Sequence, residues 1–367
     1  MVTGRPQLHL GAALDGAGRH PAAWRVSSAD PAALFTSAHY LAHARLAESA
    51  LLDFVTLDDS LAIQPGDEGV VRGRLDPLLT FAAIAPLTRS IGLMPTVTTT
   101  HTEPFHVSTA VATLDYASRG RAGVLAVPSV TEAETRHFGR RPAPGEAAAQ
   151  AENAEVTDVI ARLWDSWEDG AIIRDEATGR FIDRAKLHYV DFAGRFFAVK
   201  GPSITPRPPQ GHPVIAVYGD SPHAVPAEVV LTEAADPAAI RRVADRAPGA
   251  KVFATVSVLL ADTEREALAR KEELDELHGE AVRPDGLEYT GDPAGLAEAL
   301  PAWAEAAGVD GFLVRPAVLP EDLRRFAEDV VPRLRRAGAF RDAYPAATLR
   351  ENLGLPVAVN QYAGASR

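Results

Sequence analysis

Two polar segments stand at the ends of short apolar runs and carry residue types suited to catalysis or binding. Asp58-Asp59-Ser60 closes the run that begins at Asp53. Paired carboxylates serve acid–base chemistry and metal binding, but adjacent strand residues point to opposite faces. One of the two Asp is therefore expected to bind the polar edge of a ligand, with hydrogen bonding to loop amides as the alternative. Thr96–Thr102 offers hydroxyls that donate and accept, although Thr is also a common strand residue.

Three histidines, His20, His101 and His106, lie nearest the same ends and are the candidates for a catalytic base or substrate anchor. A zinc site needs three converging ligands, and these histidines lack a diagnostic spacing, so a metal is not favoured. Each histidine has the alternative role of packing a loop or capping a helix. The absence of cysteine excludes thiolate metal sites and thiol nucleophiles. No Gly-x-Ser-x-Gly elbow and no Gly-rich nucleotide fingerprint follows a predicted strand.

Short, continuous, β-branched runs predict the buried strands that position these residues. The eight strands are Gln7–Leu14, Asp53–Asp58, Ile91–Thr98, Ala122–Val127, Pro213–Tyr218, Glu228–Thr232, Lys251–Leu260 and Gly311–Arg315. Apolar residues at helical spacing predict helices between them. These are Pro31–Leu52, Pro104–Ser118, Ala147–Trp167, Asp236–Ala247, Asp262–Gly279, Asp292–Ala307 and Pro320–Gly338. Several begin with Asp followed by Pro or a small residue, which is typical of a helix N-cap.

The alternation of strands and helices favours a (β/α)8 TIM barrel of α/β class, with a doubly wound open sheet as the competing fold. Sites in such barrels lie at the carboxyl ends of the strands. Further candidates at these ends are Trp24, Tyr218, Asp220, Ser221 and Arg315. Neither an internal repeat nor a linker divides the chain, which predicts one domain over residues 1–367.

Two stretches interrupt the alternation. Residues 168–211 are rich in Gly, Pro and aromatics, which predicts a long insertion loop with little regular structure, packed on the barrel. Residues 339–367 are predicted to form an irregular, non-helical tail that wraps the surface or a partner subunit.

Composition limits the possible partners. Lys and Arg total 37 and Asp and Glu total 49, so the net charge is −12. An acidic surface argues against nucleic-acid binding and against docking on anionic membranes. The first 14 residues do not resemble a signal peptide, and no apolar run reaches the ~20 residues that span a bilayer. A cytoplasmic protein is therefore expected.

Motifs over nearly the whole chain resemble one family. Gly18–Arg25 and Leu163–Asp169 are similar to the opening and mid-chain motifs of the nitrilotriacetate / dibenzothiophene-sulfone monooxygenase group. This group belongs to the bacterial-luciferase-like flavin monooxygenases. The specific central run Gly179–Ile215 and the segments Asp310–Pro320 and Thr348–Leu355 also match.

The resemblance implies a TIM barrel that binds reduced FMN delivered by a separate flavin reductase and oxygenates a small organic substrate. The protein's part would be to hold the ring, exclude water and orient the substrate. A homodimer is expected. By resemblance, Asp59 contacts the flavin, Thr98 lies beside it and Ser221 binds its phosphate. Gln150, at the place of a family Tyr, is the fourth candidate cofactor contact.

Other positions depart from the family pattern. Leu125 replaces an Asn, Glu146 a His and Glu152 an Arg. The Gly-Ala-Ser-x-x-Gly phosphate loop reads Gly219–Ala224, and the next strand follows at once, so a helix is expected to be missing. Carboxylates near a phosphate disfavour its binding, and Arg140, Arg141 or His223 are the candidates to compensate. Two alternatives therefore stay open: a flavin-lapsed barrel that acts as a binding or partner subunit, and a deazaflavin-dependent oxidoreductase.

Overall fold

The chain forms a closed barrel of eight parallel strands in the computed structural model, which describes residues 7–363 except 65, 67, 222–224, 226 and 284. Around the barrel the strands are β1 (His9–Ala13), β2 (Phe54–Leu57), β3 (Gly92–Thr98), β4 (Gly123–Val127), β9 (Val214–Tyr218), β10 (Val229–Thr232), β11 (Lys251–Leu260) and β13 (Gly311–Pro316). β1 pairs with both β2 and β13, and β10 pairs with both β9 and β11, so the ring closes. All eight predicted strands and the TIM barrel are confirmed.

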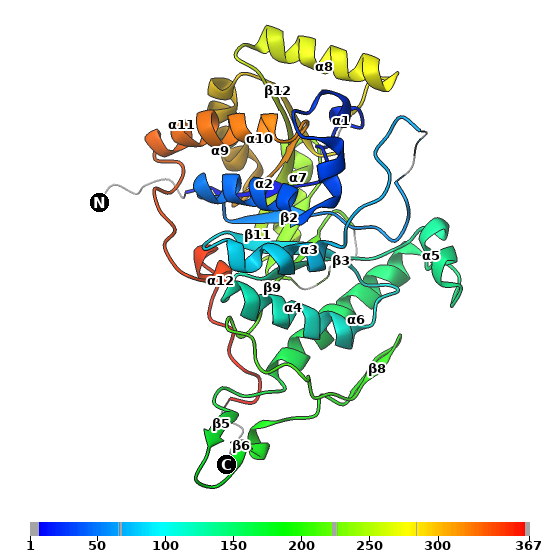
Figure 1. The fold of residues 1–367 in the computed structure, drawn as a ribbon, viewed down its shortest axis with the longest axis vertical. Helices are drawn as coiled ribbons and strands as arrows, with labels where there is room; N and C mark the ends of the chain where they lie inside the picture. The colour runs from blue at the N-terminus through cyan, green and yellow to red at the C-terminus, as the bar shows by residue number, and fades with distance from the viewer. Residues whose placement is uncertain are drawn as a thin grey trace.

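A stack of helices covers the strands (Figure 1). The longer ones are α2 (Ser37–Ser49), α3 (Pro77–Ile84), α4 (Pro104–Ser118), α6 (Glu146–Asp165), α7 (Pro237–Arg246), α8 (Glu264–His278) and α9 (Pro293–Ala307). The shorter ones are α1 (Ala23–Val26), η1 (Pro31–Phe35), η2 (Ala85–Leu87), α5 (Glu132–Phe138), η3 (Arg184–Lys186), α10 (Glu321–Arg325), η4 (Phe326–Val330) and α11 (Val331–Arg336). The side chains of Asp236 and Asp292 accept backbone N–H groups at the helix starts, each followed by Pro, as the sequence predicted.

Outside the insertion and the tail, the short helices α1 and η2 were not predicted, nor were α3, α5 and β12. α3 is apolar on nearly every side and short, and α5 has seven residues, so neither shows a clear helical period. β12 (Leu287–Gly291) is a half-exposed parallel strand that pairs with β11 outside the barrel. The connection from β9 to β10 has no helix among its described residues, which agrees with the sequence.

The insertion is more regular than predicted. It contains two hairpins, β5 (Ile172–Asp175) with β6 (Arg180–Ile182) and β7 (Phe192–Ala193) with β8 (Ala198–Val199). Val199 is buried against Leu163 of α6, which ties the insertion to the barrel. The hairpin of β5 and β6 extends away from the stacked helices (Figure 1). Tyr362 of the tail stacks on His188 of the insertion, at 3.9 Å between ring centroids.

The tail is also less irregular than predicted, because it contains the short helix α12 (Leu349–Asn352). Thr348 and Glu351 form a capping box that starts this helix. Leu349 and Leu353 are fully buried in the barrel interior together with Phe54 and Phe253. The tail thereby closes the amino-terminal end of the barrel and leaves the carboxyl ends of the strands to form a site.

Candidate active site

The carboxyl ends of the strands surround a cavity of about 400 Å³, at the end where this fold places its sites. Strands β1, β2, β3, β4, β9 and β13 and the first turns of α6 supply the wall. The polar residues of the wall are Asp15, Arg19, Thr56, Asp58, Thr96, Glu146, Gln150, Asn153, Tyr218, Asp220, Glu233 and Arg315. A cavity of this size is within the range of small-molecule sites.

Arg315 is the buried cation of this cavity, with 6% of its surface exposed. Its Nη2 donates to the Tyr218 hydroxyl at 2.8 Å and lies 2.5 Å from a Glu233 carboxylate oxygen. These two contacts fix the guanidinium between β9 and β10. Its Nη1 is buried and has no hydrogen-bond partner among the residues that the structure describes. Buried polar groups normally have partners, so this nitrogen marks a place for a ligand acceptor.

Thr96 of β3 supplies a second such group. The residue is 1% exposed and lines the same cavity, and its Oγ1 finds no partner in the described part of the chain. Its neighbour Thr99 differs, since its hydroxyl donates to Asn153 Oδ1 at 3.0 Å. The hydroxyl of Thr96 is therefore available to donate or accept, as a binding site requires.

Two carboxylates lie together at the ends of β1 and β2. The backbone N–H of Asp58 donates to Asp15 Oδ1 at 2.8 Å, and both residues line the cavity. The Asp58 side chain reaches solvent within the cavity, yet protein atoms surround it closely. This loss of hydration, followed by repulsion from Asp15, raises the pKa of Asp58 from 3.8 to about 6. Asp58 can therefore hold or release a proton near neutral pH.

A second cavity of about 530 Å³ adjoins the first, because Asp15, Arg19 and Asp58 line both. His20, Trp24, Phe35 and other residues of the β1 and β2 loops form its wall. The His20 ring is fixed, since its Nδ1 accepts from the Ala22 N–H and its Nε2 lies 3.2 Å from Asp275. Burial lowers the pKa of His20, although Asp275 opposes this effect.

Comparison with known proteins identifies the family. The family model described as luciferase-like monooxygenase matches residues 19–314, which is most of the chain. The chain belongs to the luciferase-like monooxygenase family. The sequence resemblance is confirmed, and the chain is an oxidoreductase of this family.

Curated relatives span the luciferase-like chain almost completely. N-acetyl-S-(2-succino)cysteine monooxygenase of Bacillus subtilis (strain 168) is 30% identical, over 99% of this chain and 100% of that protein. Nitrilotriacetate monooxygenase component A of Aminobacter aminovorans is 32% identical, over 95% and 96%. Dibenzothiophene-sulfone monooxygenase of Rhodococcus erythropolis is 30% identical, over 91% and 93%.

Solved structures confirm the luciferase-like fold. EDTA monooxygenase from Chelativorans sp. BNC1 superposes with a TM-score of 0.83 at 23% identity, over 95% of this chain and 98% of that one. A long-chain alkane monooxygenase superposes with a TM-score of 0.87 at 23% identity, over 95% and 96%. At 23% identity, these two similarities support only the fold.

The predicted catalytic histidines of this luciferase-like chain lie in different places. His20 lines the second cavity, as described above. His101 stacks on Phe138 at 4.7 Å between ring centroids and lies 3.4 Å from the Thr135 hydroxyl; burial, followed by Arg141, lowers its pKa. His106 is exposed in the first turn of α4. Neither His101 nor His106 lines the two cavities, and their catalytic roles stay predictions.

Of the predicted cofactor contacts, Gln150 lines the 400 Å³ cavity from α6. Asp59 lies next to Asp58 and accepts from the Ser60 N–H at 2.8 Å, and burial raises its pKa to about 6. Thr98 Oγ1 lies 3.5 Å from Thr102 Oγ1. Ser221 follows Asp220 at the beginning of the β9–β10 connection. Their roles as flavin contacts stay predictions.

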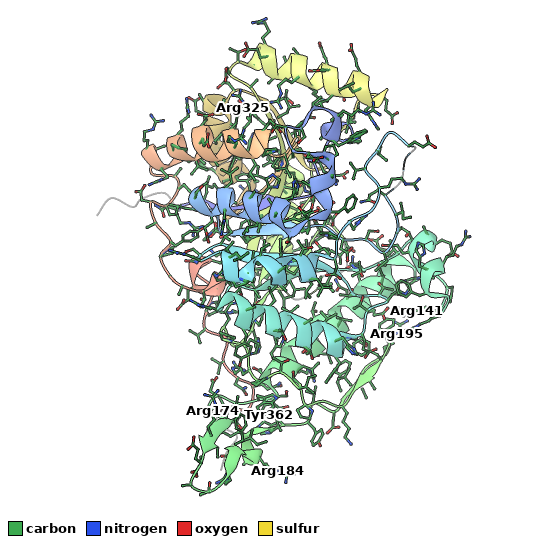
Figure 2. The ribbon with its side chains drawn as sticks, viewed as in Figure 1. Arg141, Arg174, Arg184, Arg195, Arg325 and Tyr362 are labelled. Carbon is green, nitrogen blue, oxygen red and sulfur yellow. The ribbon has the colours of Figure 1, made fainter. Side chains whose placement is uncertain are left out.

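The residues that depart from the family pattern divide into two groups. Leu125 and Glu146 line the cavity. Glu152 is instead buried in an ion pair with Arg141 at 2.8 Å, so its charge is compensated; Arg141 lies in the connection between α5 and α6 (Figure 2). Arg140 is exposed, and His223 lies outside the described residues.

Sequence reasoning placed Tyr218, Arg315 and the threonine run at the strand ends but did not single out Thr96 or Arg315 as ligand contacts. Asp15 was missed, although it directly follows the predicted first strand. The unpartnered atoms and the pairing of Asp15 with Asp58 depend on tertiary structure. Within the described residues, no cluster of His, Asp and Glu could hold a metal ion, and no helix is long and apolar enough to cross a membrane.

Proposed function

We propose that this protein is a reduced-flavin-dependent monooxygenase that takes reduced FMN from a separate flavin reductase and oxygenates a small organic substrate. The observation that carries the proposal is the cavity of about 400 Å³ at the strand ends, in a chain of this family. The adjoining cavity of about 530 Å³ gives a substrate a place beside the flavin.

The residues present fit the ring of a flavin. Arg315 Nη1 and Thr96 Oγ1, buried and unpartnered in the described structure, match carbonyl oxygens of the ring. Gln150, Thr98 and Asp59 are the further contacts that we assign to it. The fit to a phosphate rests on Ser221, since carboxylates dominate the described wall.

The protein's own residues would position the reactants and control protons. Bound reduced flavin supplies the electrons that activate dioxygen for the oxygenation. Arg315 and Thr96 would hold the ring, and the apolar strand ends around Leu125 and Leu313 would help to exclude water from the cavity. Asp58 exchanges a proton near neutral pH between the two cavities. His20, with His101 and His106 as further candidates, is the proposed substrate anchor or base.

The partner and location belong to the same proposal. Nitrilotriacetate monooxygenase component A is by its name one part of a larger system, which supports a separate reductase as the source of reduced flavin. We assign the chain to a cytoplasmic homodimer. Light scattering on the purified protein tests the dimer directly.

The deciding experiment is an anaerobic titration of the purified protein with FMN and with photoreduced FMN, followed by flavin fluorescence and absorbance. We expect the reduced form to bind at micromolar concentration. Absence of binding by both forms, with a folded circular dichroism spectrum, would overturn the proposal in favour of a flavin-lapsed partner subunit.

A parallel titration with the deazaflavin F420 addresses the third class. The curated relatives that cover nearly the whole chain at 30–32% identity are monooxygenases by name, which favours reduced FMN over F420. F420 is therefore expected to bind more weakly than reduced FMN, and the opposite order would contradict the proposal.

A further inference from the structure

We infer that this barrel holds its flavin by the ring, through Arg315 and Thr96, and that the 5′-phosphate contributes little to affinity. The inference rests on the proposed function and specifies which part of the cofactor the site recognises. It predicts that riboflavin and FMN bind nearly equally.

Arg315 is the first of the two groups that we assign to the flavin ring. Tyr218 and Glu233 hold Nη2, so the guanidinium has a fixed direction, while Nη1 remains buried without a partner in the described structure. Thr96, on β3, carries a second buried atom without a partner in the described structure. Both side chains line one cavity, so one ligand can satisfy both groups and recover the cost of leaving them unpaired.

The charges around Arg315 define the ligand. Glu233 already neutralises the guanidinium at 2.5 Å, and the carboxylate of Asp15 also acts on it. A further full negative charge is therefore unfavourable, and a neutral carbonyl oxygen is preferred. The pyrimidine edge of a flavin alternates carbonyl, N–H and carbonyl. Donors on Arg315 and Thr96 match the carbonyls, and Asp58 in the same wall can accept from the N–H.

The cavity wall is acidic where a phosphate would have to bind. Five carboxylates line the cavity, against two arginines: Asp15, Asp58, Glu146, Asp220 and Glu233. Both arginines have carboxylate partners, since Arg19 contacts Asp285 at 3.0 Å and Arg315 contacts Glu233. A phosphate near this wall meets net negative charge, and a phosphate site would need cations or free amide N–H groups.

Asp220 is the most informative of these carboxylates. It begins the β9–β10 connection, where the described residues contain no helix whose N-terminus could bind an anion. The Asp220 carboxylate accepts from the Thr232 hydroxyl and from the Glu233 N–H at 2.8 Å. Because these bonds fix the charge in place, Asp220 opposes a phosphate that approaches Ser221.

The test compares reduced FMN with reduced riboflavin on the full-length protein by anaerobic titration. We expect dissociation constants within about threefold of each other for the wild type. Arg315→Gln should weaken both ligands equally, by about tenfold or more, and Thr96→Val should do the same to a smaller extent. Asp220→Asn should tighten FMN several-fold and leave riboflavin unchanged. Arg195→Gln, on the exposed insertion, is the matched control and should change neither constant.

The outcomes separate the inference from the proposed function. If no reduced flavin binds to the wild type, the proposed function fails. If FMN binds but riboflavin is weaker by more than about thirtyfold, the proposed function stands and the inference is overturned. Unchanged binding by folded Arg315→Gln would also overturn it. Should Arg315→Gln fail to fold, the isosteric Thr96→Val decides, since loss of binding supports the ring contact and unchanged binding contradicts it.

Discussion

Asp115, near the amino-terminal end of the barrel, and Thr96 and Arg315, at the carboxyl end, differ in whether their buried polar atoms have hydrogen-bond partners. Asn352 Nδ2, in the tail helix near the amino-terminal end, is one buried atom that has no partner in the described structure. At the amino-terminal end, the buried Asp115 accepts from the Ala122 N–H at 3.1 Å and from the Gln210 backbone and side-chain N–H groups at 3.0 and 2.6 Å. At the carboxyl end, Thr96 Oγ1 and Arg315 Nη1 have no partner in the described structure.

This difference distinguishes residues that stabilise the fold from residues that we expect to bind a ligand. A polar group that is satisfied within the protein contributes to folding. One that is buried without a partner destabilises the free protein and is retained where it serves a function. The amino-terminal end should therefore govern stability, and the mouth should govern binding.

Truncation of one buried side chain in the tail is the strongest test of whether the amino-terminal end stabilises the fold. Leu349→Ala removes a fully buried side chain from the closed end of the barrel and should lower the free energy of unfolding by about 3 kcal/mol. Urea denaturation measures it. Flavin affinity of the folded fraction should not change, and a selective loss of affinity would break the proposed division. Val357→Ala, 81% exposed in the same tail, is the control.

Removal of the Asp115 carboxyl is the next largest test. Asp115→Ala leaves three N–H donors unpaired in a buried region, so we expect a loss of about 2 kcal/mol. Asp158→Ala, which breaks an exposed pair with Arg162, should cost less than about 0.5 kcal/mol. Equal losses in the two variants would contradict a special role for the closed end.

The two ends also differ in how far the sequence predicted them. The strand ends follow from short apolar runs, so the positions of Tyr218 and Arg315 at the mouth were predictable. For the tail segment around Leu349 the sequence predicted no helix, because a four-residue helix has too few turns for a visible period. The cluster that holds Leu349 also contains Phe54, nearly 300 positions earlier, and Phe253, about 100 positions earlier, and no local pattern reveals such packing.

The candidate site was predicted less completely than the fold. Asp59 was favoured over Asp58 by resemblance, whereas Asp58 lines the cavity and contacts Asp15. Adjacent strand residues point in opposite directions, but which of them faces inward depends on the register of the barrel. The missing partners of Thr96 and Arg315 are properties of packing and could not be read from the sequence.

Thr96→Val tests whether the Thr96 hydroxyl at the mouth is an unsatisfied buried group. The substitution keeps the shape but removes an unpartnered buried hydroxyl, so the unfolding free energy should rise by about 1 kcal/mol while flavin affinity falls. Thr98→Val, on the same strand, loses a bond to Thr102 and should be neutral or slightly destabilising. A stability gain in Thr98→Val but not in Thr96→Val would refute the assignment of Thr96 as the unsatisfied group.

The smallest effect concerns the Asp58 carboxyl. Because its pKa of about 6 in the folded protein lies above the unfolded value of 3.8, the folded protein binds this proton more tightly, and stability is lost as the pH rises from about 4 to about 6. Asp58→Asn removes the charge and keeps an oxygen that can accept from the Asp59 N–H.

The melting temperature of Asp58→Asn should therefore exceed that of the wild type by an amount on the order of 1 °C at pH 8, a modest rise because solvent screens the group. At pH 4 the difference should vanish, since the wild-type carboxyl is then protonated. Asp245→Asn, exposed on α7, should show no such pH dependence. A stabilisation of equal size at both pH values would mean that the charge of Asp58 does not destabilise the folded protein. The raised pKa of Asp58, and its proposed role in proton exchange, would then be contradicted.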